Sequence, residues 1–288
     1  MKNANRVTNT FALLLLLMTF GSVPAFAQMD FSGDWQPLNY REHETIDSIP
    51  GEYIGLPLNE AGIMRADAWW GSILTLPEWQ CRPHSGAYVT RGPSELRIWK
   101  EVDPVTRRIT AFHREWLRSV DNPVYLDGRP HPSPNAPHTW GGFSTGEWIG
   151  DVLKITTTHL KEELIRNNGV PLSDQTTVLE YLFRHGDILT SVLIVTDPVY
   201  MTEPLIKSAD RQLNLNAQMA PYPCVVVEEQ ERARGAVPHF LPGQNPDLTE
   251  FANAFELPQE AARGGAEKMY PEYQQKLKQL QGAKSSPK

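Results

Sequence analysis

Apolar and polar residues alternate with a period of two through most of the middle of the chain, and this pattern predicts β-strands. The alternation begins at Ser94, a turn at Asp103-Pro104 interrupts it, and a second strand is expected from Arg108 to Arg118. Further segments of this kind are Val124–Leu126, Glu147–His159, Thr176–Arg184, Ile188–Asp197, Met201–Leu215 and Tyr222–Val227. Eight to ten short strands separated by turns predict a mainly β, antiparallel fold.

The strand expected at 108–118 carries polar residues on both faces, with His113 on one and Arg114 on the other. Such a strand suits the wall of a barrel with a partly polar interior, or a sheet that is covered on both sides. We therefore predict an up-and-down β-barrel or a strongly curved sheet. The segment Gly33-Asp34-Trp35 resembles the start of the first strand in lipocalin and calycin barrels, whose tryptophan plugs the barrel floor. That resemblance concerns architecture only.

Helical spacing is confined to the flanks of the strand region. A helix is expected at 58–69, capped by Asn59, and a proline-punctuated loop follows it at 76–84. Short helices are expected at 247–252, from Pro258 and at 271–281, with disorder from Gly282 to the end. The predicted organisation is a barrel domain at 28–228 and a proline-rich, helical extension at 229–288.

The first 27 residues are typical of a cleaved signal peptide. Lys2 and Arg6 precede an apolar run at 11–20, and Ala25-Phe26-Ala27 supplies a cleavage pattern before Gln28. The alternative is a retained membrane anchor, but the apolar run is shorter than the roughly 20 residues that a span needs. The sequence therefore predicts a periplasmic or secreted protein without a membrane span in the mature chain.

Composition narrows the possible partners. The formal net charge is -7, and removal of Lys2 and Arg6 takes it to -9. An acidic chain without a basic patch argues against nucleic acid as a partner. Cys81 and Cys224 are expected to form a disulfide in an oxidising compartment, with two buried thiols as the alternative. The sequence leaves the oligomeric state open.

The stretch from Val124 to Thr158 is the leading site candidate, because acidic, basic, histidine and tryptophan side chains surround a long proline-rich loop between two strands. On an extended segment Asp127, Arg129 and His131 would point to one side. They form a workable acid/base set, in which Asp127 orients His131 and Arg129 holds an anionic group. The alternative is that Asp127 stabilises its own turn while Arg129 makes a structural ion pair.

Aromatic and histidine side chains around this stretch are candidates for a ligand pocket, since pockets are mostly apolar with a few polar groups. The ligand-binding candidates are Tyr125, His138, Trp140, Trp148, Trp99, Trp116 and His113. Ordinary barrel core is the alternative for each tryptophan. His131 and His138 could also share a metal with His113 or His159, but no tight ligand spacing supports this. No metal or cofactor is predicted, and nucleophile-elbow and phosphate-loop motifs are missing from the sequence.

Three motifs carry a second resemblance. They are Asp30-Phe31-Ser32-Gly33-Asp34-Trp35, Tyr125-Leu126-Asp127-Gly128-Arg129-Pro130-His131-Pro132 and Gly146-Glu147-Trp148-x-Gly150-Asp151. Together they resemble a family of exported bacterial proteins of unassigned function, over nearly the whole mature chain. The resemblance implies no catalytic residue. Three hypotheses follow: a binding protein for a small, largely apolar or aromatic ligand, a cofactor-free acid/base enzyme (isomerase, lyase or hydratase), or a structural, partner-docking module.

Overall fold

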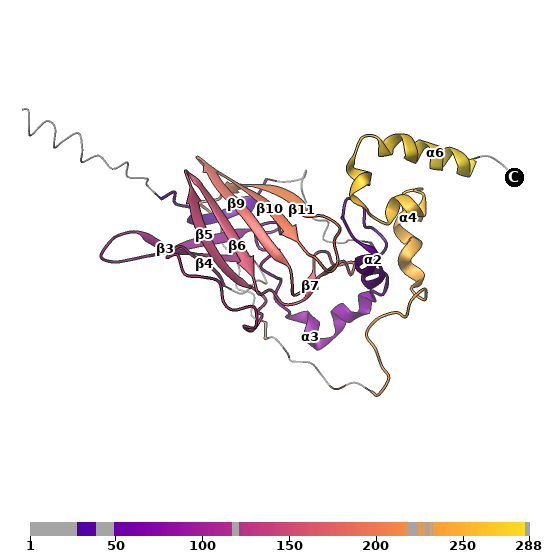
Figure 1. Ribbon diagram of the computed structural model, residues 1–288, viewed down its shortest axis with the longest axis horizontal. Coiled ribbons are helices and arrows are strands. Elements are labelled where there is room, and N and C mark those ends of the chain that lie inside the picture. The colour runs from indigo at the N-terminus through magenta and orange to yellow at the C-terminus, as the bar shows by residue number, and fades with distance from the viewer. Residues whose placement is uncertain are drawn as a thin grey trace, which may run out of the picture.

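The computed structural model describes residues 28–38, 49–116, 121–217, 224, 225, 227, 231 and 233–285. The predicted signal peptide lies outside the described residues, as do Tyr222, Pro223 and Val226 of the strand predicted at 222–227. The other three residues of that predicted strand, Cys224, Val225 and Val227, are described and belong to no strand. Figure 1 shows a barrel of strands with helices gathered at one end.

Nine strands close into a barrel, which confirms the predicted fold class. They are β1 (Gly33–Pro37), β2 (Leu96–Val102), β3 (Ile109–Trp116), β4 (Asn122–Tyr125), β5 (Phe143–Ile149), β6 (Val152–Thr158), β9 (Thr177–His185), β10 (Ile188–Thr196) and β11 (Leu205–Leu213). Their order around the barrel is β1-β11-β10-β9-β6-β5-β4-β3-β2. A two-residue pair, β7 (Glu163–Leu164) and β8 (Pro171–Leu172), is inserted between β6 and β9.

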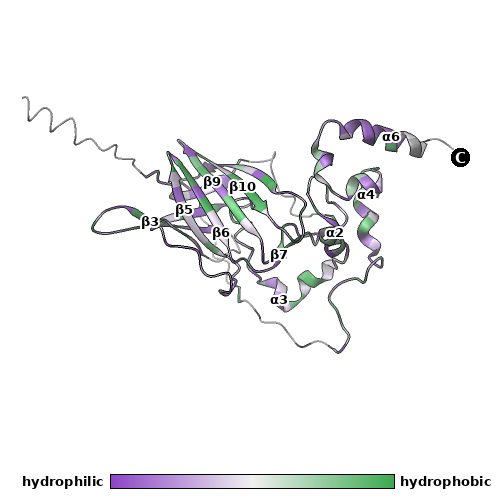
Figure 2. Cartoon of the chain, in the orientation of Figure 1, coloured by the Kyte–Doolittle hydropathy of each residue, from purple (hydrophilic) through white to green (hydrophobic). Residues whose placement is uncertain are grey.

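Alternation along each strand decides which side chains enter the barrel. In β6, Leu153, Ile155 and Thr157 are buried, whereas their neighbours are only partly covered. Hydrophilic and hydrophobic residues correspondingly alternate along the strands in Figure 2. Trp35 is fully buried where β1 closes the barrel, and its indole N–H donates to the carbonyl oxygen of Phe31 at 2.9 Å.

One strand pair departs from the antiparallel expectation: β4 and β5 are parallel, with Val124 beside Ser144. Parallel neighbours need a crossover connection of about a dozen residues or more, because the chain must return to the end from which it started. Residues 126–142, which we call the crossover loop, make this connection. Strand β5 also begins at Phe143, four residues before the predicted strand start at Glu147.

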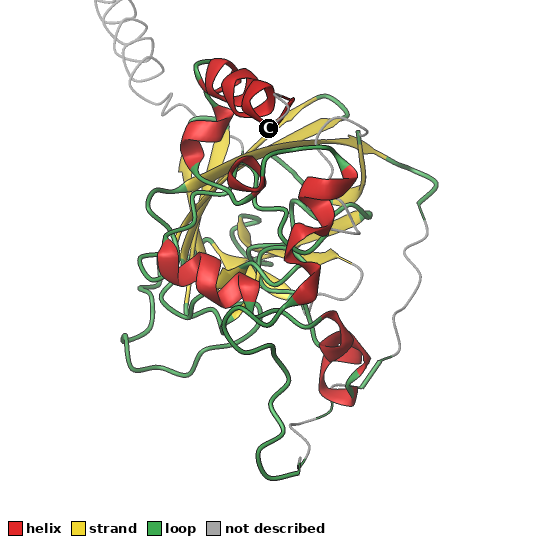
Figure 3. Cartoon of the chain, turned by 90° about the vertical axis from the view of Figure 1, so that its right-hand side faces the viewer, coloured by secondary structure: helices red, strands yellow, loops and turns green. Residues whose placement is uncertain are grey.

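The barrel interior is occupied by the chain itself. Residues 85–92 are all buried, although they form neither a strand nor a helix. Tyr88 and Val89 pack in one core cluster with inward side chains of seven barrel strands, and Ala87 joins a second cluster. The guanidinium of Arg211 on β11 donates to the carbonyl oxygens of Thr90 and Gly92. We call residues 85–92 the plug. Figure 3 looks at the helix-covered end of the molecule, where helices and loops overlie the ring of strands.

Helices cover one end of the barrel. They are α2 (Glu60–Asp67), η1 (Gly71–Thr75), α3 (Pro77–Gln80), η2 (Pro246–Thr249), α4 (Glu250–Ala254), α5 (Gln259–Ala262), η3 (Ala266–Met269) and α6 (Tyr273–Ser285). Asn59 caps α2 as predicted, accepting from the backbone N–H of Gly62. The expected loop at 76–84 contains the short helix α3, which starts on Pro77, because proline is favoured at a first helical position. The disorder expected from Gly282 is wrong as far as Ser285, since α6 continues to that residue.

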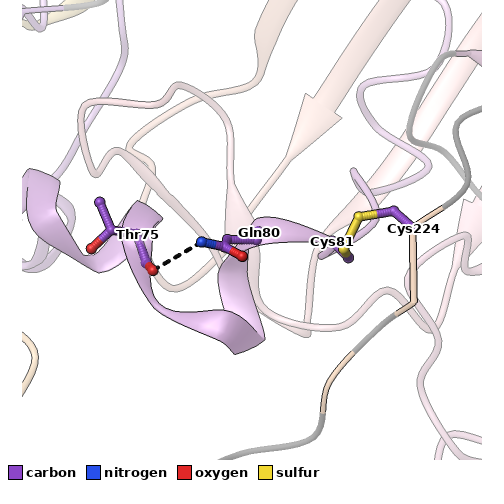
Figure 4. The surroundings of a disulfide bond; sticks show 4 residues. All are labelled: Thr75, Gln80, Cys81 and Cys224. Atoms are coloured by element: carbon purple, nitrogen blue, oxygen red, sulfur yellow. Dashed lines mark hydrogen bonds between the residues drawn. A yellow bond between two sulfur atoms is a disulfide. The ribbon is translucent and has the colours of Figure 1, made fainter.

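The C-terminal segment packs on α2 and on the residues that flank it. The backbone N–H of Tyr53 donates to Ala262, and the side-chain amide of Asn245 donates to the carbonyl oxygens of Asp67 and Trp69. Phe251 contributes to a small apolar cluster at this seam. The predicted disulfide between Cys81 and Cys224 is present, directly after α3 (Figure 4).

Candidate functional site

The crossover loop lies on the outer wall of the barrel, not across an open end. His131 hydrogen-bonds with Nδ1 to the hydroxyl of Thr158 and with Nε2 to the hydroxyl of Thr145, both at 2.8 Å. The neighbours Ser144 and Thr157 are buried and bond to each other inside the wall, so Thr145 and Thr158 face outward. The loop runs along the wall because it has to connect the two parallel strands.

The predicted acid/base set is not assembled by these contacts. The Asp127 carboxylate is bound by the guanidinium of Arg129 at 2.5 Å, and these hydrogen bonds hold the pKa of Asp127 below its usual value. Arg129 also lies 3.7 Å over the ring of Tyr125. Both ring nitrogens of His131 are engaged by threonines, so Asp127 does not orient it. This arrangement corresponds to the alternative given in the sequence analysis, in which Asp127 stabilises its own turn and Arg129 makes a structural ion pair.

Trp99 and His113 form a separate group on the outer face of β2 and β3. Their rings stack with centroids 5.1 Å apart. His113 bonds to the Asp121 carboxylate at 2.8 Å and to that of Glu101 at 2.9 Å. Although partial burial acts to lower the pKa of His113, the two carboxylates outweigh that effect and raise it. The two carboxylates therefore favour the protonated form of His113, and neither of them belongs to the crossover loop.

The remaining predicted ligand-binding residues are divided between core and surface. Trp116 is buried and packs against Tyr88 of the plug, and Trp148 stacks on Phe31 with centroids 5.7 Å apart. Trp140 lies under the Arg82 guanidinium at 4.3 Å, on the outside. His138 bonds to the carbonyl oxygen of Leu160. The structure therefore does not bring the predicted site residues together around one pocket.

A cavity of about 610 Å³ lies elsewhere, between the start of β11, residues 52–57 and η3. Its wall includes Ile206, Met269 and Tyr270, whose side chains are 62%, 66% and 56% exposed. These are large apolar surfaces to leave in water, and their convergence on one cavity is typical of an interaction site. Its volume lies within the roughly 300–1,000 Å³ range of small-molecule pockets. We call it the seam cavity.

The charged side chains that line the seam cavity are two acidic and two basic residues. The Arg166 guanidinium lies 3.7 Å from the Glu52 carboxylate, and Glu203 and Lys207 complete the charged lining. Because two acidic and two basic side chains balance, the cavity carries no excess charge that would select an anion or a cation. Its chemistry therefore favours a largely apolar, neutral occupant.

None of the predicted site residues lines the seam cavity. Sequence analysis missed it because Ile206 reads as one strand residue among many, and Met269 and Tyr270 occur in a polar terminal segment. The sequence contained one weak indication of this cavity. Met269 and Tyr270 are adjacent large apolar residues in a terminal segment that is otherwise polar.

No group of histidine, cysteine and acidic side chains in the described ranges is arranged to hold a metal ion. Within the same ranges, no helix combines the length and apolar character that a membrane crossing requires. Comparison with family models, curated proteins and solved structures finds no match for the chain. Its functional interpretation therefore rests on its own residues.

Proposed function

We propose that this chain is an exported β-barrel protein that binds a small, largely apolar molecule in the seam cavity. The observation that carries the proposal is the convergence of exposed Ile206, Met269 and Tyr270 on a cavity of suitable volume. The filled barrel interior argues for a site at the seam in place of a central one. Met269 suits an adaptable site, because its unbranched thioether fits ligands of varied shape.

The binding site can be tested with the neutral fluorophore N-phenyl-1-naphthylamine. Ile206→Ser should weaken its binding at least five-fold, since the lost apolar burial is worth about 1 kcal/mol or more. The matched control is Val105→Ser, which changes an aliphatic side chain of 86% exposure in the β2–β3 turn. The proposal would be overturned if both variants weakened binding equally. It would also be overturned if neither the wild type nor the Val105→Ser control bound the fluorophore saturably.

A partner-docking module is the second candidate function, and the filled barrel with its surface Asp127–Arg129 pair favours it. In that case the apolar lining of the seam cavity would contact a polypeptide. Native mass spectrometry of the protein isolated from its own compartment separates the two. A co-purifying small-molecule mass supports the binding protein, and a co-purifying polypeptide mass supports the module.

A further inference from the structure

Three histidines fasten the crossover loop to the barrel wall. His131 and His138 belong to the loop, and His159 directly follows β6. His131 bonds to Thr145 and Thr158, His138 Nδ1 to the Leu160 carbonyl oxygen, and His159 Nε2 to the Ser133 carbonyl oxygen at 2.9 Å. Thr158 also bonds to His159 Nδ1 at 2.7 Å. One further side-chain hydrogen bond joins wall and loop without an imidazole, from the Asn122 amide on β4 to the Gly141 carbonyl oxygen.

The contacts have a consistent proton arrangement with all three histidines neutral. A carbonyl oxygen only accepts, so His159 donates through Nε2 to Ser133 and accepts at Nδ1 from the Thr158 hydroxyl. Thr158 then accepts from Nδ1 of His131, whose Nε2 accepts from the Thr145 hydroxyl. Each donor in this chain meets an acceptor, and the Thr158 hydroxyl both donates and accepts.

Protonation disturbs this chain in two stages. One proton on His159 is tolerated if every hydrogen bond from Thr158 to Thr145 reverses its direction. A second proton, on His131, makes both imidazoles donate to Thr158, whose own hydroxyl hydrogen then loses its acceptor in the chain. The rings of His138 and His159 have centroids 5.3 Å apart, so their positive charges repel each other when both are protonated.

The surroundings offer the protonated histidines little compensation. Neighbouring charged groups have other partners: Arg129 pairs with Asp127, Lys154 with Glu147, Arg82 with Glu163, Glu162 with Arg65, and Lys161 lies over Trp140. In the part of the chain that the structure describes, no carboxylate contacts the three histidines. Burial, with a smaller contribution from His159, lowers the pKa of His131.

We propose that His131, His138 and His159 form a proton-sensitive clamp, which holds the crossover loop on the barrel wall when neutral and releases it on acidification. The sign follows from the geometry and from the direction of the His131 shift. A lowered folded-state pKa gives a stabilisation that is present above the ordinary histidine value of about 6.5 and is lost as the pH falls from that value through the lower folded-state pKa. The three histidines do not line the seam cavity.

Hydrogen exchange of the loop amides tests the clamp. The N–H of Thr139 donates to the His159 carbonyl oxygen, and the N–H of Lys161 donates to the Thr139 carbonyl oxygen, so these two amides report directly on loop attachment. We expect their protection, corrected for intrinsic exchange, to fall at least ten-fold between pH 7.5 and pH 5.0. Amides of the β9–β10 hairpin should change less than two-fold and serve as the internal reference.

Variants distinguish the clamp from general acid destabilisation. The double variant His131→Gln/His159→Gln keeps donors and acceptors but does not titrate, so it should lose the pH response. His113→Gln alters a histidine whose hydrogen-bond partners, Asp121 and Glu101, lie outside the loop, so this variant should retain the pH response in full. A wild-type loop equally protected at both pH values overturns the proposal, as does a response that persists in the double variant. If the double variant does not fold, the wild-type exchange profile decides the question alone.

Discussion

Arg114 and Glu180 face each other inside the barrel, where both side chains are almost completely buried. Arg114 Nη1 donates to the Glu180 carboxylate at 2.5 Å, and Nη2 donates to the side-chain oxygen of Asn122. Within the described residues, Arg114 Nε and Glu180 Oε1 are buried without a hydrogen-bond partner. Such a pair does little for net stability, yet removing one partner exposes the full cost of a buried charge.

We expect Glu180→Ala to lower the free energy of unfolding by about 3–5 kcal/mol, because Arg114 stays charged without its counterion. The double variant Arg114→Met/Glu180→Leu should recover much of this loss. Urea denaturation measures both. The control is Glu147→Ala, which breaks the surface pair with Lys154 and should cost about 1 kcal/mol or less. Equal losses in Glu180→Ala and Glu147→Ala would contradict this account.

Arg211 is a second buried cation, and its hydrogen bonds go to carbonyl oxygens. Its buried guanidinium bonds to the carbonyl oxygens of Trp35, Thr90, Gly92 and Ser94. Burial lowers its pKa to about 10, so it remains charged at neutral pH. Its role is structural, because this single side chain of β11 joins the plug to the barrel wall.

At the scale of elements, the plug and the crossover loop meet at Gly86. The N–H of Gly86 donates to the carbonyl oxygen of Trp140 at 2.9 Å, and a Cβ on Gly86 would lie 2.4 Å from the carbonyl oxygen of Gly141. Glycine is required there by the close approach of two backbones. The two irregular segments therefore support each other across the rim of the barrel.

Gly86→Ala should destabilise the protein by about 1–3 kcal/mol, because neither backbone is free to move away from the added methyl group. Gly71→Ala provides the matched control: its Cβ would meet nothing within 4 Å. That variant should stay within about 0.5 kcal/mol of the wild type. Thermal unfolding compares the two. Similar melting temperatures for both variants would show that the contact at Gly86 is loose.

For the whole molecule, the disulfide joins Cys81 to a cysteine 143 residues further along the chain. In the chain-entropy account, a cross-link stabilises by restricting the unfolded state, and the effect grows with the length of the closed loop. This loop encloses all of the barrel strands except β1. The disulfide therefore constrains nearly the whole barrel.

Replacing both cysteines by serine should cost about 2–5 kcal/mol of unfolding free energy. Wild-type protein in dithiothreitol should show the same loss in guanidinium denaturation, whereas the reductant should leave the double variant unchanged. A wild-type midpoint that does not respond to dithiothreitol after complete reduction, verified by thiol titration, would contradict the prediction.

The sequence by itself determined the features that depend on neighbouring residues. Alternation with period two identified most barrel strands, because side chains of a strand point to opposite faces. Asn59 identified the start of α2, since a cap requires only a side-chain oxygen three residues before an N–H. The two cysteines, in a chain with a predicted signal peptide, predicted the disulfide.

Tertiary structure decided the features that depend on how the barrel closes. Periodicity does not distinguish a parallel β4–β5 pair from an antiparallel one. The sequence therefore indicated a functional loop at 126–142, whereas the loop is long because it connects two parallel strands. The plug shows no periodic alternation of apolar and polar residues. It is buried because nine strands enclose a space that it fills. The histidine clamp and the seam cavity join residues remote in sequence, such as His131 with Thr158 and Ile206 with Met269. Such contacts exist only once the chain is folded.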